Sequence, residues 1–150
     1  MIKNKNLVFS APFMIIGIIM IVLGARWILV DQPWMLDQIA NEERLGLTFN
    51  ELFKPEINKT LPGYLKQIYT FFGLWVIIIG LFITLFSMPN IAKNRFVRSI
   101  LLICIGAMIF IATMLGYIWI PSSPFIYLSW GLVLLYFISL YGHLKIDTED

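Results

Sequence analysis

The chain has 150 residues, of which 59% are hydrophobic and 13% are charged, and its formal net charge is +2. Soluble domains carry about 25% charged residues, so this composition, with a mean hydropathy of +0.84, excludes an ordinary soluble domain. The small net charge, without basic clusters interleaved with aromatic residues, argues against a nucleic-acid partner. The single cysteine, Cys104, excludes an intrachain disulfide and a CxxC redox pair. Fingerprints such as GxxxxGK(S/T) and HExxH are absent, and we expect no cofactor and no metal site.

Four long apolar runs account for the high hydropathy, over about residues 9–28, 69–88, 97–120 and 125–141. About 20 residues of α-helix cross a hydrocarbon core of about 30 Å, so these runs predict membrane spans. The first run is longer than the apolar region of a cleaved signal peptide, which favours a retained signal anchor. The predicted fold class is all-α: a polytopic membrane protein whose residues 1–150 form one domain, an antiparallel left-handed bundle of four transmembrane helices.

The connection between the first two spans, residues 31–67, is long enough to contain short helices of its own. Asp31 is placed as a possible N-cap, and Gly46 is placed to end the helix that follows. The stretch TFNE (residues 48–51) matches a capping box and predicts a second short helix at this point. Pro62 then predicts the start of a helix that continues into the second span.

The basic residues predict the orientation in the membrane. One side of the predicted bundle carries Lys3, Lys5, Lys93, Arg95, Arg98 and Lys145. The other side carries Arg26, Arg44, Lys54, Lys59 and Lys66, and all of these but Arg26 are spread over the long loop together with six acidic residues. Short basic loops near the ends of spans are typically cytoplasmic. We therefore expect both termini in the cytoplasm and the 31–67 loop outside.

Small side chains recur every seven residues in three of the four spans. The three sets are Ser10, Gly17 and Gly24; Gly73, Gly80 and Ser87; and Ser99, Gly106 and Thr113. A seven-residue period keeps such residues on one stripe of a helix in a left-handed bundle. Small residues let helix backbones approach where lipid provides no hydrophobic drive for association. We interpret the three stripes as helix–helix seams; the general abundance of glycine in membrane helices is the alternative explanation.

Arg26 lies near the end of the first apolar run, and two interpretations of it stay open. A charge deep in the bilayer is costly and usually functional, which favours a polar lining for a cavity under the 31–67 loop. However, the uncharged residues that precede Arg26 already suffice to cross the membrane, and arginine can extend toward the headgroups. Trp27 and Trp34 flank it like an aromatic belt, which favours an anchor at the outer interface.

The remaining polar residues assemble no catalytic set. The single histidine, His143, cannot form a bis-histidine haem site and is expected to be solvated at the end of the fourth span. Gly73-Leu74-Trp75 shares its letters with a claudin motif, but the cysteines that follow in claudins are missing. No Ser/His/Asp set and no pair of membrane carboxylates is present, so we expect a protein that is not an enzyme, at most an accessory subunit of one.

The layout resembles that of DoxX-like small membrane proteins, on the stretches GIIMIVLGARWILVDQPW and FFGLWVIIIGLFITLF. The shared features are a glycine-bearing first helix, an outer segment with an Asp/Pro break, and a second helix of the form GLWxxxxGLF. The resemblance implies a four-helix fold and a relation to proteins some of which look like subunits of quinone-linked oxidoreductases. It carries no catalytic residue over to this chain.

Two functional hypotheses follow from these observations. The first is a non-catalytic integral membrane subunit that packs into and stabilises a larger membrane protein complex. Twelve Phe, five Trp and six Tyr supply large surfaces for contact with other subunits and with membrane lipids. The second is a lipid-, sterol- or quinone-binding protein whose lipophilic ligand lies in a cavity under the 31–67 loop, with Arg26 at its mouth.

Overall fold

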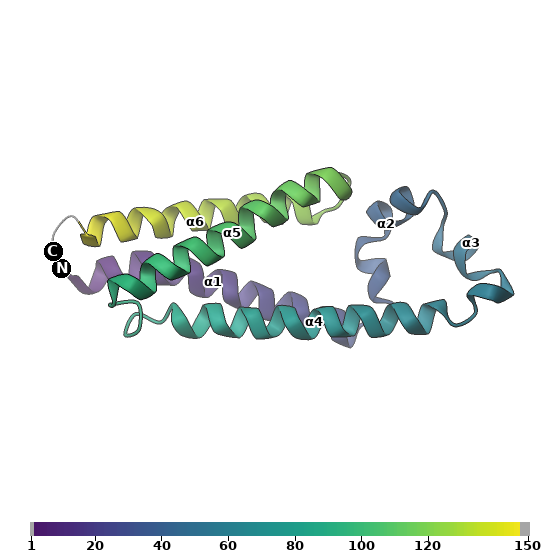
Figure 1. The fold of residues 1–150 in the computed structure, drawn as a ribbon, viewed down its shortest axis with the longest axis horizontal. Helices are drawn as coiled ribbons and strands as arrows, with labels where there is room; N and C mark the ends of the chain where they lie inside the picture. Colours follow the sequence, from purple (N-terminus) through teal and green to yellow (C-terminus); the bar gives the residue numbers. More distant parts are fainter. Residues whose placement is uncertain (1, 148–150) are drawn as a thin grey trace.

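In the computed structural model, four long helices form a bundle, and four short helical segments lie between the first two of them (Figure 1). The structure describes the backbone of residues 2–147 and the side chains of residues 6–146. The long helices are α1 (Ile2–Leu29), α4 (Leu61–Phe86), α5 (Arg95–Trp119) and α6 (Phe125–Asp147). All four are long and apolar enough to span a membrane, which confirms the predicted all-α polytopic class.

Each long helix extends beyond its predicted apolar run at one end or both. α4 begins at Leu61, well before its apolar run, as the position of Pro62 had indicated. α5 begins directly after Asn94, whose side-chain oxygen accepts hydrogen bonds from the amides of Phe96 and Val97 at 2.9 and 3.4 Å. Hydropathy locates the segment that suits lipid, whereas capping groups determine where the helix begins.

The segment between α1 and α4, which we call the outer segment after its expected side of the membrane, contains η1 (Pro33–Asp37), α2 (Gln38–Leu45), α3 (Phe49–Phe53) and η2 (Glu56–Asn58). Gly46 ends α2 as predicted, in the left-handed conformation with φ 67° that glycine adopts without steric cost. The predicted capping box is also confirmed: the Glu51 amide donates to Thr48 Oγ1 at 3.2 Å, and the Thr48 amide donates to the Glu51 carboxylate at 2.9 Å.

The expectation that Asp31 caps the first outer helix is wrong. The residue that precedes η1 is Gln32, and its side chain makes no capping hydrogen bond. Asp31 instead accepts a hydrogen bond from Lys66 Nζ of α4 at 3.0 Å. Pro33 at the start of η1 has no amide hydrogen, so fewer backbone donors need a cap there.

The bundle is open on one side. α1 packs along α4 on one flank and along α6 on the other, and α5 packs on α6. α4 and α5 follow each other in the chain but contact each other little. Figure 1 shows that α5 crosses the bundle obliquely and diverges from α4, while the outer segment lies at the end opposite the start of α1 and the end of α6.

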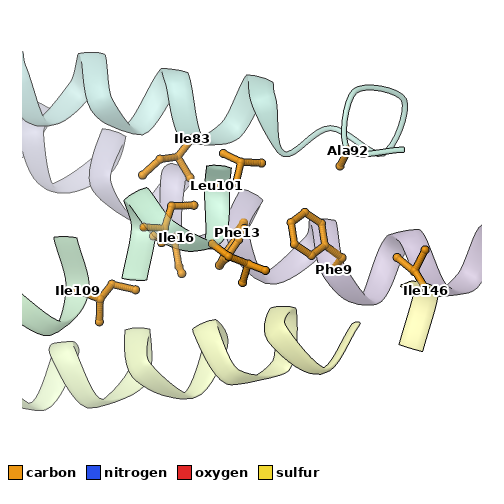
Figure 2. Close-up of a cluster of buried hydrophobic side chains, with 10 residues drawn as sticks. Phe9, Phe13, Ile16, Ile83, Ala92, Leu101, Ile109 and Ile146 are labelled. Carbon is orange, nitrogen blue, oxygen red and sulfur yellow. The ribbon is translucent and has the colours of Figure 1, made fainter. Parts of the chain in front are cut away.

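The buried apolar cluster is formed by residues of the four long helices and of the α4–α5 turn, and Figure 2 shows its side chains between these helices. Phe9, Phe13 and Ile16 of α1 are fully buried, and the rings of Phe9 and Phe13 meet edge to face at 5.2 Å. Ile105 and Ile109 of α5 belong to the same cluster. Lipid chains are as apolar as these side chains, so in a membrane the cluster stabilises the bundle through van der Waals packing.

Candidate functional site

The small residues of α1 and α4 face each other in antiparallel register. A Cβ atom at Gly17 would lie 2.6 Å from the Gly80 carbonyl oxygen, and one at Gly24 would lie 2.5 Å from the Gly73 carbonyl oxygen. The third members of the two stripes, Ser10 and Ser87, are fully buried. At the glycine pairs the two helices thus touch backbone to backbone, an approach that any side chain there would prevent.

The third stripe, on α5, faces α6 at its centre. A Cβ atom at Gly106 would lie 2.8 Å from the Tyr136 hydroxyl oxygen. Ser99 donates a hydrogen bond to the Arg95 carbonyl oxygen one turn earlier, at 3.1 Å, and Thr113 is half-buried. This stripe therefore meets an aromatic ring at Gly106, and not a second row of small residues.

A further close approach, between α6 and α1, was not predicted from the sequence. A Cβ atom at Gly142 would lie 2.7 Å from the Phe9 amide nitrogen. The buried Ser139 hydroxyl donates to the Phe9 carbonyl oxygen at 2.8 Å. These two small residues are three apart and not seven, so a search for a seven-residue period overlooks them, although small residues at i and i+3 share one helix face.

The three residues predicted as an interface anchor or cavity lining lie in three different environments. Arg26 is exposed in the last turn of α1. Trp27 is wedged between helices: its ring lies 4.9 Å from Phe72 of α4 and 5.5 Å from Phe125 of α6. Trp34 is buried in η1, where its ring lies 5.6 Å from that of Phe53. The sequence could not separate them, because all three are close together in the chain.

The outer segment covers a cavity of about 390 Å³ between α2, α3 and α4. Trp34, Phe49, Leu52, Leu65 and Tyr69 are among the residues that line it. Polar groups there include the Asn41 amide, which donates to the Trp34 carbonyl oxygen at 3.0 Å and to the Tyr69 hydroxyl at 3.3 Å. Arg26 is not one of the lining residues, so the cavity under the loop and the arginine are separate features.

Hydrogen bonds also join the outer segment to the turn between α5 and α6. The three contacts, which we call the outer latch, run from Ser123 Oγ to the Asp37 carboxylate at 2.9 Å, from Ser122 Oγ to the Glu43 carboxylate, and from the Arg44 guanidinium to the Trp119 carbonyl oxygen at 3.0 Å. They connect residues 75 to 86 positions apart in the chain. The outer latch therefore ties the α5–α6 hairpin to the segment carried by α1 and α4.

Asp37 is the partly buried acid of the outer latch. Burial raises the pKa of its carboxyl group above the ordinary value of 3.8, and the hydrogen bond from Ser123 opposes this rise without cancelling it. The carboxyl oxygen Oδ1 is buried and has no hydrogen-bond partner within the described part of the chain. The ionised form of Asp37 is thus less well accommodated than the neutral form.

Arg98 and His143 form a polar cluster that the sequence reasoning missed. Arg98 is 2% exposed; its Nη1 donates to the carbonyl oxygens of Ala92 at 3.2 Å and Lys93 at 2.9 Å, and its Nε donates to His143 Nδ1 at 3.3 Å. Arg98 was expected among the surface charges, and His143 was expected to be solvated; the arginine is buried and the histidine half-buried. The span predicted over 97–120 already contains Arg98, and a charge within a span is the signal that identifies it.

A groove opens where α4 and α5 diverge. Its volume is about 420 Å³, and the side chains that line it are apolar apart from the Cys104 thiol. Among the lining residues, Ile83, Leu101 and Ile105 are buried, whereas Phe82 and Phe96 are exposed. The groove lies in the half of the bundle near the α4–α5 turn, far along both helices from the outer segment.

Comparisons with protein-family models, with curated proteins and with solved structures find no match to this chain. The resemblance to DoxX-like proteins stays a prediction. Within the described residues, no three histidine, cysteine, aspartate or glutamate side chains are grouped so that they could hold a metal ion. The geometry available for a functional proposal consists of packing surfaces, the cavity under the outer segment and the α4–α5 groove.

Proposed function

We propose that the protein is a non-catalytic integral membrane subunit that packs into and stabilises a larger membrane protein complex. The observation that carries this proposal is the free flank of α4. This helix packs on α1 along one side, and it exposes large aromatic side chains elsewhere in its outer half. We further propose that the termini are cytoplasmic and the outer segment external, because the short α4–α5 turn is basic.

Phe71 and Trp75 form the centre of this flank. Their side chains are 62% and 50% exposed, and their rings meet edge to face at 6.0 Å. Residues at i and i+4 lie on one helix face, and their mutual contact orders both rings before a partner arrives. Tryptophan and other aromatic residues are enriched at the centres of protein interfaces.

A shallow depression of about 520 Å³ lies beside Phe71. Leu74 supplies apolar surface to it, and Gln67 and Thr70 supply polar side chains. Polar and small side chains within a spanning helix support hydrogen bonding to a neighbouring helix. The occupant that suits this combination is a transmembrane helix of a partner subunit, because the surface runs along a spanning helix.

The test is native electrophoresis of the protein extracted from its own membranes in mild detergent. The wild-type chain should migrate with a larger complex, and the double variant Phe71→Ala, Trp75→Ala should shift to the free protein. The matched control is Tyr127→Ala, Leu134→Ala on α6, which removes side chains that are 82% and 63% exposed and should leave the complex intact. A wild-type chain that migrates alone, without co-purifying protein, contradicts the proposal.

A second candidate function is favoured by the cavity under the outer segment. A volume of about 390 Å³ with a few polar groups suits a small lipophilic molecule such as a lipid, sterol or quinone. Mass spectrometry of the protein purified from native membranes should then detect a stoichiometric ligand. Leu65→Trp, which fills the cavity, should abolish the ligand, whereas Arg26→Leu should retain it. A wild-type protein without such a ligand, or ligand retention in Leu65→Trp, contradicts this candidate.

A further inference from the structure

The α4–α5 groove has dimensions that match one leaflet of a bilayer. Its lining residues extend on α5 from Phe96 to Met108, which at 1.5 Å per residue is about 18 Å of helix. Half of a hydrocarbon core of about 30 Å is about 15 Å. A transmembrane helix of a partner would contact α4 and α5 across the whole membrane, whereas this groove accommodates an apolar chain from one leaflet.

The lining of the groove restricts the chemistry of its occupant. Phe82 and Phe86 of α4 and Ile100 of α5 contribute hydrocarbon surface, and Cys104 contributes only a weakly polar thiol. Water in such a space would lack the two to four polar partners that hold a buried water molecule. The occupant is therefore hydrocarbon along the length of the groove.

A basic residue lies at the end of the groove next to the α4–α5 turn. Lys93 is exposed in this turn, which connects the groove-lining residues Phe86 and Phe96. The buried Arg98 guanidinium holds this turn in place through the carbonyl oxygens of Ala92 and Lys93. Lys93 therefore provides a positive charge where an acyl chain in the groove would meet its headgroup.

From these features we propose that the α4–α5 groove binds one acyl chain of an anionic phospholipid, whose phosphate is held at Lys93. Basic pockets at the ends of spanning helices recognise acidic headgroups in this way. The site is independent of the proposed partner surface at Phe71 and Trp75, which lies in the other half of α4. The titration below uses the purified protein, so its result does not depend on whether a complex forms.

The first experiment tests the headgroup. The purified, delipidated protein is titrated in detergent with dioleoyl phosphatidylglycerol or dioleoyl phosphatidylcholine, and bound lipid is counted by native mass spectrometry. Phosphatidylglycerol should bind more tightly, and added salt should reduce the difference. Lys93→Gln should weaken phosphatidylglycerol binding about fivefold, the change expected for one basic residue near a membrane surface. Lys54→Gln removes the same charge from the outer segment and should have no effect.

The second experiment tests the groove. Cys104→Phe places a ring among the lining residues and should reduce the binding of phosphatidylglycerol at least tenfold. Ile103→Phe is the matched control, because the neighbouring Ile103 is 71% exposed and is not a lining residue. Thermal unfolding of both variants checks that the bundle is intact. Any of three results overturns the proposal: equal binding of the two lipids by the wild-type protein, equal effects of Lys93→Gln and Lys54→Gln, or undiminished binding by a folded Cys104→Phe variant.

Discussion

The close backbone contact between α1 and α4 at Gly17 yields a quantitative prediction for Gly17→Ala. The new methyl group would lie 2.6 Å from the Gly80 carbonyl oxygen and 2.8 Å from the Thr84 amide nitrogen, and it would also meet Thr84 Oγ1. The hydroxyl can rotate away, but the two backbone atoms cannot. To restore an ordinary contact of 3.4 Å, α1 and α4 must separate locally by up to roughly 0.8 Å.

This separation determines the expected loss of stability. A gap of about 0.5–1 Å removes about a quarter to a half of the dispersion attraction between facing atoms, and overpacked sites typically lose about 1–3 kcal/mol. We expect a loss of about 2–3 kcal/mol, because the obstruction is backbone on the opposing helix. The higher helix propensity of alanine offsets little of this, since spanning segments remain helical when the bundle comes apart in detergent.

The measurement is thermal unfolding of the purified protein in detergent. A loss of about 2–3 kcal/mol corresponds to a midpoint lower by about 4–12 °C for a chain of this size. Gly131→Ala in α6 is the matched control, because a Cβ atom there meets nothing within 4 Å, and its midpoint should match the wild type. If Gly17→Ala unfolds at the same temperature as Gly131→Ala, the backbone contact between α1 and α4 does not hold the bundle together.

Two further predictions concern polar contacts between helices. The pKa of Asp37 is raised in the folded state, so its contribution to stability is full below its ordinary value of 3.8 and is lost as the pH rises through the raised pKa. Asp37→Asn should remove this pH dependence and stabilise the protein at neutral pH; an unchanged profile of unfolding midpoint against pH would show that burial of this carboxyl group is unimportant. Ser139→Ala removes the buried hydrogen bond to the Phe9 carbonyl oxygen and should cost about 0.5–1.5 kcal/mol in detergent unfolding. If the unfolding midpoint of Ser139→Ala equals that of the wild type, the hydrogen bond from Ser139 to the Phe9 carbonyl oxygen does not stabilise the protein.

The four spans could be identified from the sequence because length and hydropathy are local properties. The end of α2 and the start of α3 were likewise predictable, since the left-handed Gly46 and the Thr48 capping box act within a few residues. The small-residue stripes were visible for the same reason. Nothing in them specified that the Gly17 stripe meets the Gly80 stripe, because pairing depends on the register of two segments about 60 residues apart.

The contacts of Arg98, the outer latch and the open side of the bundle emerged only from the tertiary structure, although the position of Arg98 within a predicted span marks it as a candidate. Each depends on which helix face turns inward, and neither α1 nor α6 has a distinct polar face that would indicate this. In a soluble protein the polar face of a helix marks the solvent side, but in lipid both sides of a spanning helix are apolar. The sequence by itself therefore determined that four helices cross a membrane, where α2 ends and where α3 begins. The packing of backbones and polar groups in three dimensions decided which helices touch, where a groove remains, and that Arg98 lies inside.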